Sequence, residues 1–162
     1  MKYSILGLLV AGLVGCGGGG GDSDNGGSTS SPGSSSKVLV SDAVTINEDA
    51  YKGASFTLNR NADVKTSVKI LDGPAIEAYL VSEREYNAWV AITQGQQFTD
   101  AELRYYSELS ISPVATQHES KWVRLEQGTY YFILENTDFG STLPPINFKD
   151  DVAFVEYSIS VK

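Results

Sequence analysis

The chain has 162 residues, of which 41% are hydrophobic and 10% aromatic, so it can form one packed core. Its formal net charge of −8 disfavours nucleic acid and anionic lipid as direct partners, because both bind through Lys and Arg. One cysteine and one histidine exclude an intramolecular disulfide, a Cys-x-x-Cys metal or redox site, and a histidine cluster.

The first fifteen residues have the pattern of a secretory signal peptide. Lys2 gives a positive start, and an apolar run follows over residues 5–14, about half the length of a membrane-spanning helix. The run ends in Leu13-Val14-Gly15-Cys16, which resembles the lipobox of bacterial lipoproteins. The resemblance implies that Cys16 carries a diacylglyceryl group, that cleavage precedes it, and that the new N-terminus is acylated. Several acyl chains would anchor the protein stably to a membrane.

The residues after Cys16 indicate a tether and a location. Gly17 stands where an aspartate tends to retain lipoproteins of Gram-negative bacteria at the inner membrane, which favours the outer membrane of the cell envelope. Residues 17–37 are almost wholly Gly, Ser, Asp, Asn and Thr, and they cannot bury apolar surface. We therefore predict a lipidated, disordered tether over residues 16–37, with a reach of about 25 Å, and a folded domain over residues 38–162.

The domain begins with short segments of alternating hydrophobicity. Period two extends from Val64 to Ile70 and again from Ala153 to Val161, which predicts half-buried strands. Asp72-Gly73 marks a turn, and Pro74 limits strand pairing directly after it.

One helix is clearly indicated. Ser82-Glu83-Arg84-Glu85 is a capping box before Tyr86 and Trp89, and it predicts a helix of one or two turns. A second capping box at Thr99–Glu102 precedes a segment, residues 105–111, that could equally begin a strand.

Two runs near the C-terminus predict a β-hairpin. Residues 121–125 and 129–135 are joined by Glu126-Gln127-Gly128, where Gly128 would supply a positive φ. The second run is apolar on both faces, which places it in the centre of a sheet. The fold class is therefore all-β: an antiparallel β-sandwich or jelly roll of about six to nine strands, with one or two short helices.

The C-terminal part resembles a known domain. Leu125-Glu126-Gln127-Gly128-Thr129-Tyr130-Tyr131, followed by the strand from Val155 to Val161, is similar to the end of bacterial pre-peptidase C-terminal domains. The resemblance implies a β-sandwich that accompanies secreted enzymes as a non-catalytic module, with calcium or carbohydrate bound by some relatives. The Tyr86–Trp89 segment is not part of that family pattern.

Two candidate binding sites stand out. Calcium prefers six to eight oxygen ligands, and carboxylate and amide oxygens gather around the loop between the last two strands, at Asn136, Asp138, Asp150 and Asp151. The alternative is that these residues only form turns. Tyr86 and Trp89 could stack on a sugar or a partner surface if exposed, or pack onto the sandwich if buried.

Catalytic patterns are weak. His118 lies in a polar segment, and no serine has the glycines of a nucleophile elbow around it. Paired carboxylates could hydrolyse glycosides, but no spacing singles out a pair among Glu83, Glu85, Glu102, Glu108, Asp138, Asp150 and Asp151.

These patterns predict a lipid-anchored cell-envelope protein with a non-catalytic β-sandwich that binds a protein or glycan. The alternatives are a structural envelope lipoprotein without a small ligand and, from another class, a hydrolase or its accessory domain. Exposure of Tyr86 and Trp89 would favour binding, and their burial would favour a structural role.

Overall fold

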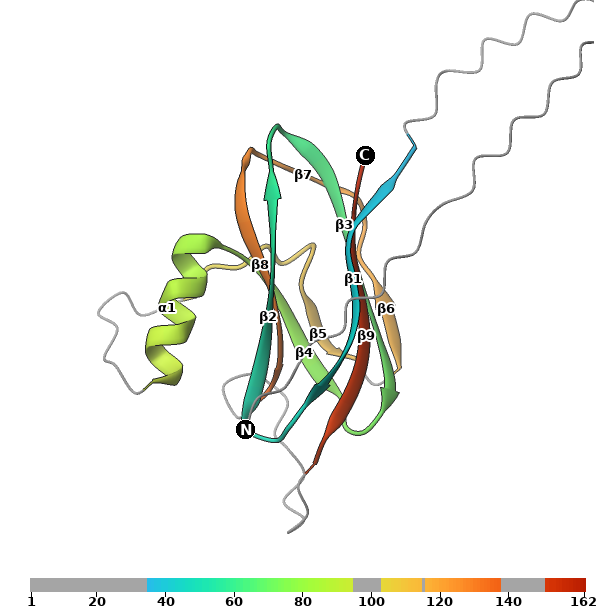
Figure 1. Ribbon diagram of the computed structural model, residues 1–162, viewed down its shortest axis with the longest axis vertical. Coiled ribbons are helices and arrows are strands. Elements are labelled where there is room, and N and C mark those ends of the chain that lie inside the picture. Colours follow the sequence, from blue (N-terminus) through green and yellow to red (C-terminus); the bar gives the residue numbers. More distant parts are fainter. Residues whose placement is uncertain (1–34, 95–102, 115, 138–150) are drawn as a thin grey trace, which may run out of the picture. The chain divides into compact units, whose positions relative to one another are not determined.

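The computed structural model describes residues 35–94, 103–114, 116–137 and 151–162 (Figure 1). These segments form one helix and nine strands, which confirms the all-β prediction. In chain order they are β1 (Lys37–Ile46), β2 (Ala50–Leu58), β3 (Ala62–Asp72), β4 (Ile76–Ser82), α1 (Glu83–Thr93), β5 (Ile111–Val114), β6 (Gln117–Glu119), β7 (Val123–Leu125), β8 (Gly128–Asn136) and β9 (Ala153–Val161).

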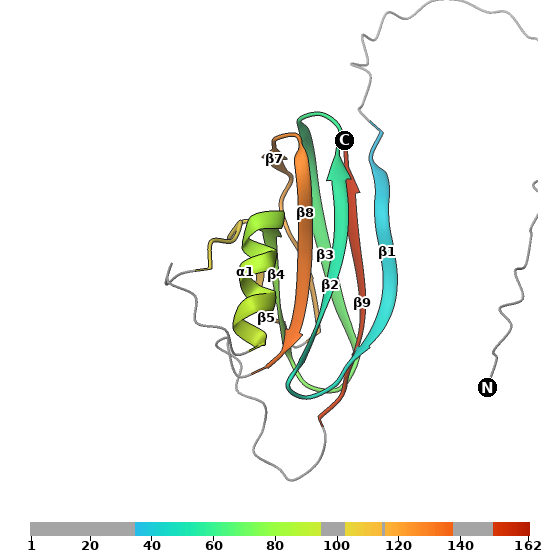
Figure 2. The same cartoon turned by 60° about the vertical axis from the view of Figure 1, so that its left-hand side comes forward.

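The strands form two antiparallel sheets that pack face to face (Figures 1 and 2). Sheet A has the order β1-β9-β3-β6, and β7 also pairs with β3. Sheet B has the order β2-β8-β4-β5. Most connections cross from one sheet to the other, so that strands adjacent in sequence face each other across the core. This order, with β6 and β7 as two parts of one strand position, is that of a jelly roll.

The main core lies between the sheets, and the alternating sequences explain why. Residues of β3 alternate strictly between buried and less buried positions from Ala62 to Val68. The same period in β9 buries Val155, Tyr157 and Ile159. Sheet B contributes the facing side chains, including the fully buried Phe132, Leu134 and Leu80.

The predicted turn at Asp72-Gly73 joins the two sheets. Gly73 has φ +92, a conformation that favours glycine, and its N–H donates to Asp72 Oδ1 at 2.9 Å. A Cβ at this position would lie 2.1 Å from the carbonyl oxygen of Val152, so a side chain does not fit.

The predicted hairpin around Gly128 is wrong. β7 pairs with β3 in sheet A, whereas β8 lies between β2 and β4 in sheet B. The connection therefore crosses the sandwich, and Gly128 does not have a positive φ. The central position of β8 is as predicted: it is buried on both faces from Phe132 to Glu135.

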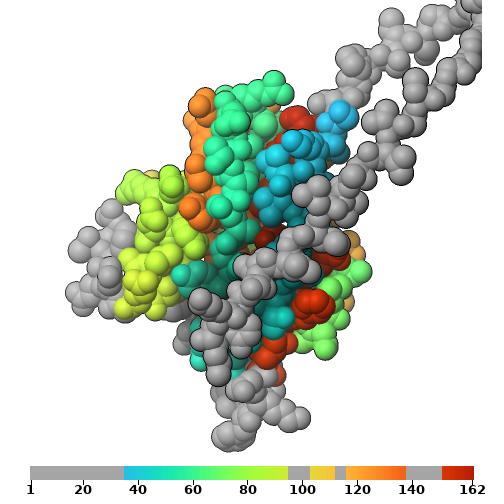
Figure 3. All heavy atoms as spheres, in the orientation of Figure 1, coloured from blue at the N-terminus to red at the C-terminus, as the bar shows by residue number. Residues whose placement is uncertain are grey.

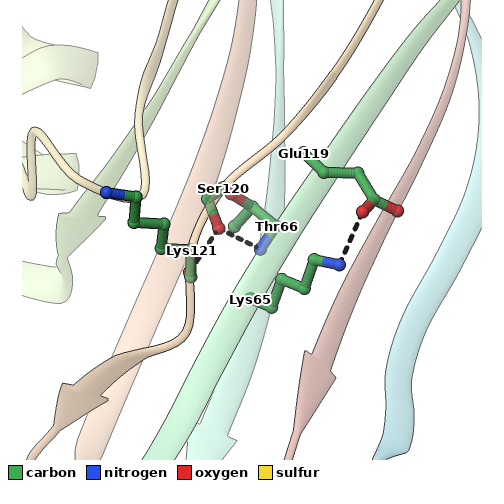
Figure 4. Close-up of polar contacts among 5 residues, drawn as sticks. All are labelled: Lys65, Thr66, Glu119, Ser120 and Lys121. Atoms are coloured by element: carbon green, nitrogen blue, oxygen red, sulfur yellow. Dashed lines mark hydrogen bonds and ion pairs between the residues drawn. The ribbon is translucent and has the colours of Figure 1, made fainter.

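Ser120 explains why β6 and β7 are separate (Figure 4). Its Oγ accepts a hydrogen bond from the Thr66 N–H at 2.9 Å and donates one to the Lys121 carbonyl at 2.9 Å. The Ser120 N–H also donates to the Thr66 carbonyl at 2.9 Å. The hydroxyl thus takes the place of a backbone acceptor opposite Thr66, and the strand is interrupted there.

Candidate functional site

The outer face of sheet B is covered by α1 (Figure 2). Strands β4 and β8 are largely buried on both faces, so their outward side chains are covered as well. The rings of this second cluster form what we call the aromatic layer: Tyr51, Tyr79, Tyr86, Trp89 and Tyr131. In the space-filling view α1 stands beside β2 and β8 (Figure 3).

The capping box places α1 as predicted, although the helix is longer than predicted, at 11 residues. Ser82 Oγ accepts the Glu85 N–H at 3.4 Å, which fixes the start of the helix at the end of β4. Trp89 is then one turn from Tyr86 and faces the sheet, with 5% of its surface exposed.

Ring contacts hold α1 onto the sheet. Trp89 packs edge-on against Tyr51 with centroids 5.8 Å apart, and it also contacts Tyr79. Tyr86 stacks on Tyr131 at 3.8 Å and lies over Gly53, where a Cβ would come within 2.7 Å of the Tyr86 ring. Glycine at this place in β2 therefore leaves the room that the Tyr86 ring occupies.

Two carboxyls lie within this covered face. Glu77 of β4 and Glu135 of β8 are directly opposite each other in the strand register, and they are 0% and 1% exposed. We call them the acid pair. Glu135 accepts hydrogen bonds from the N–H of Thr137, at 2.9 Å, and from its hydroxyl.

Burial changes the acidity of the acid pair. It raises the pKa of Glu135 from 4.5 to about 7, an effect that the hydrogen bonds from Thr137 oppose and Glu77 increases. Burial also raises the pKa of the Tyr79 phenol, as does the hydrogen-bonded Glu77 beside it. Neither glutamate is among the site residues predicted from the sequence. The available signal was a charged residue inside a strand that is apolar on both faces.

An open pocket of about 240 Å³ lies at the beginning of α1. We call it the tyrosine pocket, and it is lined by Ser82, Glu85, Arg104, Tyr105 and Tyr106. Two backbone contacts position the segment that carries the last three: the Arg104 N–H donates to Glu85 Oε2 at 3.2 Å, and the Tyr106 N–H donates to the Leu80 carbonyl at 2.9 Å.

The pocket combines exposed rings with charged groups. Tyr105 is 49% exposed and Tyr106 is 37% exposed. Tyr105 also contacts Tyr79 at 5.2 Å, so the pocket is continuous with the aromatic layer. Arg104 and Glu85 supply a hydrogen-bond donor and an acceptor beside the rings. Such a site can hold a small ring-shaped molecule with polar edges.

The predicted aromatic site residues lie next to this pocket and not in it. Trp89 is buried, and Tyr86 is half-buried and stacked on Tyr131. Their placement favours the packing interpretation over direct stacking on a ligand. Exposed rings occur instead at Tyr105 and Tyr106, which are not among the site residues predicted from the sequence.

The predicted calcium site lies partly within the described segments. Asn136 is buried and its Nδ2 donates to the Asp151 carbonyl at 2.8 Å, so these two residues are neighbours. Asp138 and Asp150 lie outside the described residues. Within the segments that the structure describes, no group of three or more His, Cys, Asp or Glu side chains could hold a metal ion. Calcium binding stays a prediction.

The residues considered for catalysis are dispersed. His118 is exposed on β6, where it is the register partner of Val68 in β3. Glu83 and Glu108 are exposed, and Glu85 lines the tyrosine pocket. Glu102 lies outside the described part of the chain, as does Cys16 with the whole predicted signal peptide. No described helix is long and apolar enough to cross a membrane.

No family model matches this chain, and no curated protein matches it.

Proposed function

We propose that this chain is a lipid-anchored, non-catalytic binding module of the bacterial cell envelope, and that its ligand site is the tyrosine pocket. The anchor rests on the lipobox that ends at Cys16 and on the Gly- and Ser-rich tether behind it. The similarity of residues 125–131 and 155–161 to pre-peptidase C-terminal domains supports a non-catalytic role.

The observation that carries the binding role is the pairing of two exposed tyrosines with Arg104 and Glu85 in one pocket. Aromatic faces stack on the apolar faces of sugar rings, and flanking charged groups hydrogen-bond the hydroxyls. The volume of about 240 Å³ is below that of a drug-sized site, so one small ring fits. A glycan is therefore the preferred ligand, in place of a protein, which needs a larger contact area.

A second candidate is a structural envelope component without a small ligand. The burial of Trp89 and the stacking of Tyr86 on Tyr131 favour it, because these rings pack against the fold. The two candidates differ only in what the tyrosine pocket does, so one experiment separates them.

That experiment is a glycan array probed with the full chain carrying Cys16→Ser, followed by titration of the glycans that bind. Under the proposed function, Tyr105→Ala lowers affinity for the bound glycan about tenfold, through loss of a stacking ring. The matched control is Phe154→Ala on β9, which removes a ring that is 40% exposed on the other sheet.

The control variant should bind like the parent chain. Absence of any bound glycan, or equal affinity of the Tyr105→Ala variant, contradicts the proposed site and supports the structural candidate.

The anchor has its own test. Replacing Cys16 with serine removes the thiol that would be lipidated, so the protein should leave the membrane fraction and appear in the soluble fraction. A Cys16→Ser protein that stays with the membranes would show that the anchor assignment is incorrect.

A further inference from the structure

The two carboxyls of the acid pair lie next to each other in a buried part of the fold. Glu77 and Glu135 are almost completely buried and directly opposite each other on adjacent strands. A buried carboxylate is costly in free energy, and a second one beside it adds repulsion. A proton held by the pair lowers both costs, since one carboxyl can then donate a hydrogen bond to the other.

We propose that the Glu77–Glu135 acid pair is a proton-binding switch that couples the packing of α1 on sheet B to pH. The protonated pair keeps the aromatic layer closed, and loss of the shared proton weakens it. This role is separate from ligand binding at the tyrosine pocket and does not depend on it.

The groups around the acid pair determine how readily it gains or loses a proton. Tyr51 of β2 is the register partner of Glu135, and Tyr79 of β4 hydrogen-bonds Glu77. Thr137 follows β8 and donates both its N–H and its hydroxyl to Glu135. From α1, Trp89 packs on both tyrosine rings. Among the residues that the structure describes, the charge that acts on Glu135 is that of Glu77, which favours the protonated form.

The same contacts transmit the change to the helix. Trp89 is held by Tyr51 and Tyr79, the two rings that flank the acid pair. A second buried negative charge would draw in water or push the side chains apart. Either response disturbs the two rings on which the Trp89 indole of α1 packs.

The direction of the pH effect follows from linkage. The Glu135 pKa is raised from 4.5 in an unfolded chain to about 7 in the fold, so the folded state holds an extra proton between these values. Stability is therefore greatest at low pH and falls as the pH rises through this window. One linked proton lowers the folding equilibrium constant about tenfold per pH unit.

The first experiment measures urea unfolding of the full chain from pH 5 to pH 8. In the Glu77→Gln/Glu135→Gln variant the amides keep the shape but do not titrate, so the fall in stability should disappear. The control is Glu108→Gln/Glu156→Gln, which removes two exposed glutamates and the same total charge. This control should keep the slope of the parent chain. A parent slope no steeper than that of the acid-pair variant overturns the proposal.

A second measurement needs no acid-pair variant and applies if that variant does not fold. Carboxyl ¹³C resonances of the parent chain, labelled at glutamate, should include one group that titrates near pH 7. Titration of every glutamate near its ordinary value of 4.5 overturns the proposal.

The coupling to α1 has a separate readout. The chain has two tryptophans, so Trp122→Phe leaves Trp89 as the only one. Its emission should shift to longer wavelength as the pH rises from 5 to 8, with the midpoint of the carboxyl titration. The shift should be absent when Trp122→Phe is combined with the acid-pair variant. An emission that does not change with pH contradicts the coupling.

Discussion

The outer faces of the two sheets differ, although both sheets share one core. On sheet A the outward residues of β3 are Lys65, Ser67 and Lys69, which face solvent with small or charged side chains. Lys65 forms an ion pair with Glu119 at 2.5 Å, and its partner is 53% exposed. On sheet B the outward residues of β4 and β8 are covered by α1 and include the acid pair.

The difference between the two outer faces indicates which side of the sandwich is suited to a functional site. An exposed strand face needs only to be soluble, and its polar groups are satisfied by water. A covered face needs ring packing and satisfied polar groups, and it can change the acidity of buried carboxyls. In the described segments, the acid pair, the aromatic layer and the tyrosine pocket all lie on the sheet B side.

The largest loss of stability should come from replacing the tryptophan of α1 that faces sheet B. Trp89→Ala removes a buried ring and is expected to lower the free energy of unfolding by about 3–5 kcal/mol. The matched variant on the sheet A side is Trp122→Ala, whose half-buried ring holds Lys162 Nζ at 4.7 Å from its centroid. The free energy of unfolding of this variant should fall by only about 1 kcal/mol. Urea unfolding measures both, and equal losses would contradict the contrast between the faces.

The next effect concerns the donor beside the acid pair. Thr137→Val removes the hydroxyl that donates to Glu135 and is expected to destabilise the fold by about 1–2 kcal/mol. Because that hydrogen bond favours the charged form, its loss should also raise the pKa of Glu135 further. Carboxyl titration by NMR measures the change. A pKa that stays constant or falls would show that Thr137 does not hold the carboxylate.

A smaller loss is expected where a ring lies over β2. Gly53→Ala places a methyl group within 2.7 Å of the Tyr86 ring, which must move off Tyr131. We expect a loss of about 1 kcal/mol in the free energy of unfolding. Ser67→Ala, on the outer face of sheet A, is the control and should change stability by less than about 0.5 kcal/mol. A Gly53→Ala protein as stable as the control would indicate that the ring is not confined.

The smallest loss of stability is expected from breaking the ion pair on sheet A. Glu119→Gln should cost less than about 1 kcal/mol, because an exposed ion pair contributes little. The loss should decrease further in about 1 M salt, which screens exposed charges. A large loss that persists in high salt would mean that sheet A depends on its surface as sheet B does.

Much of the fold could be predicted from local patterns. The alternation in β3 and β9, the turn at Gly73 and the cap at Ser82 each depend on neighbours in sequence. The prediction of a hairpin at Gly128 was wrong, and the reason is physical. A short connection with a turn residue suits two strands of one sheet, but it also suits a crossing between two packed sheets.

The candidate site was less predictable. The sequence predicts Tyr86 and Trp89 on one helix, but whether these rings face solvent depends on the sheet beneath the helix. Tyr105 and Tyr106 follow residues 95–102, and no local period marks them as exposed. The lipidation of Cys16 and the calcium ligands stay predictions.

The sequence by itself determined which positions alternate, where the helix begins, and that β8 must be covered on both faces. Each of these follows from a side-chain period or a cap within one segment. Only the tertiary structure decided that Glu77 lies opposite Glu135, and that α1 packs on the tyrosine rings beside them. Strand register and sheet assignment depend on contacts between residues 58 positions apart in the chain, and a local period carries no information about them.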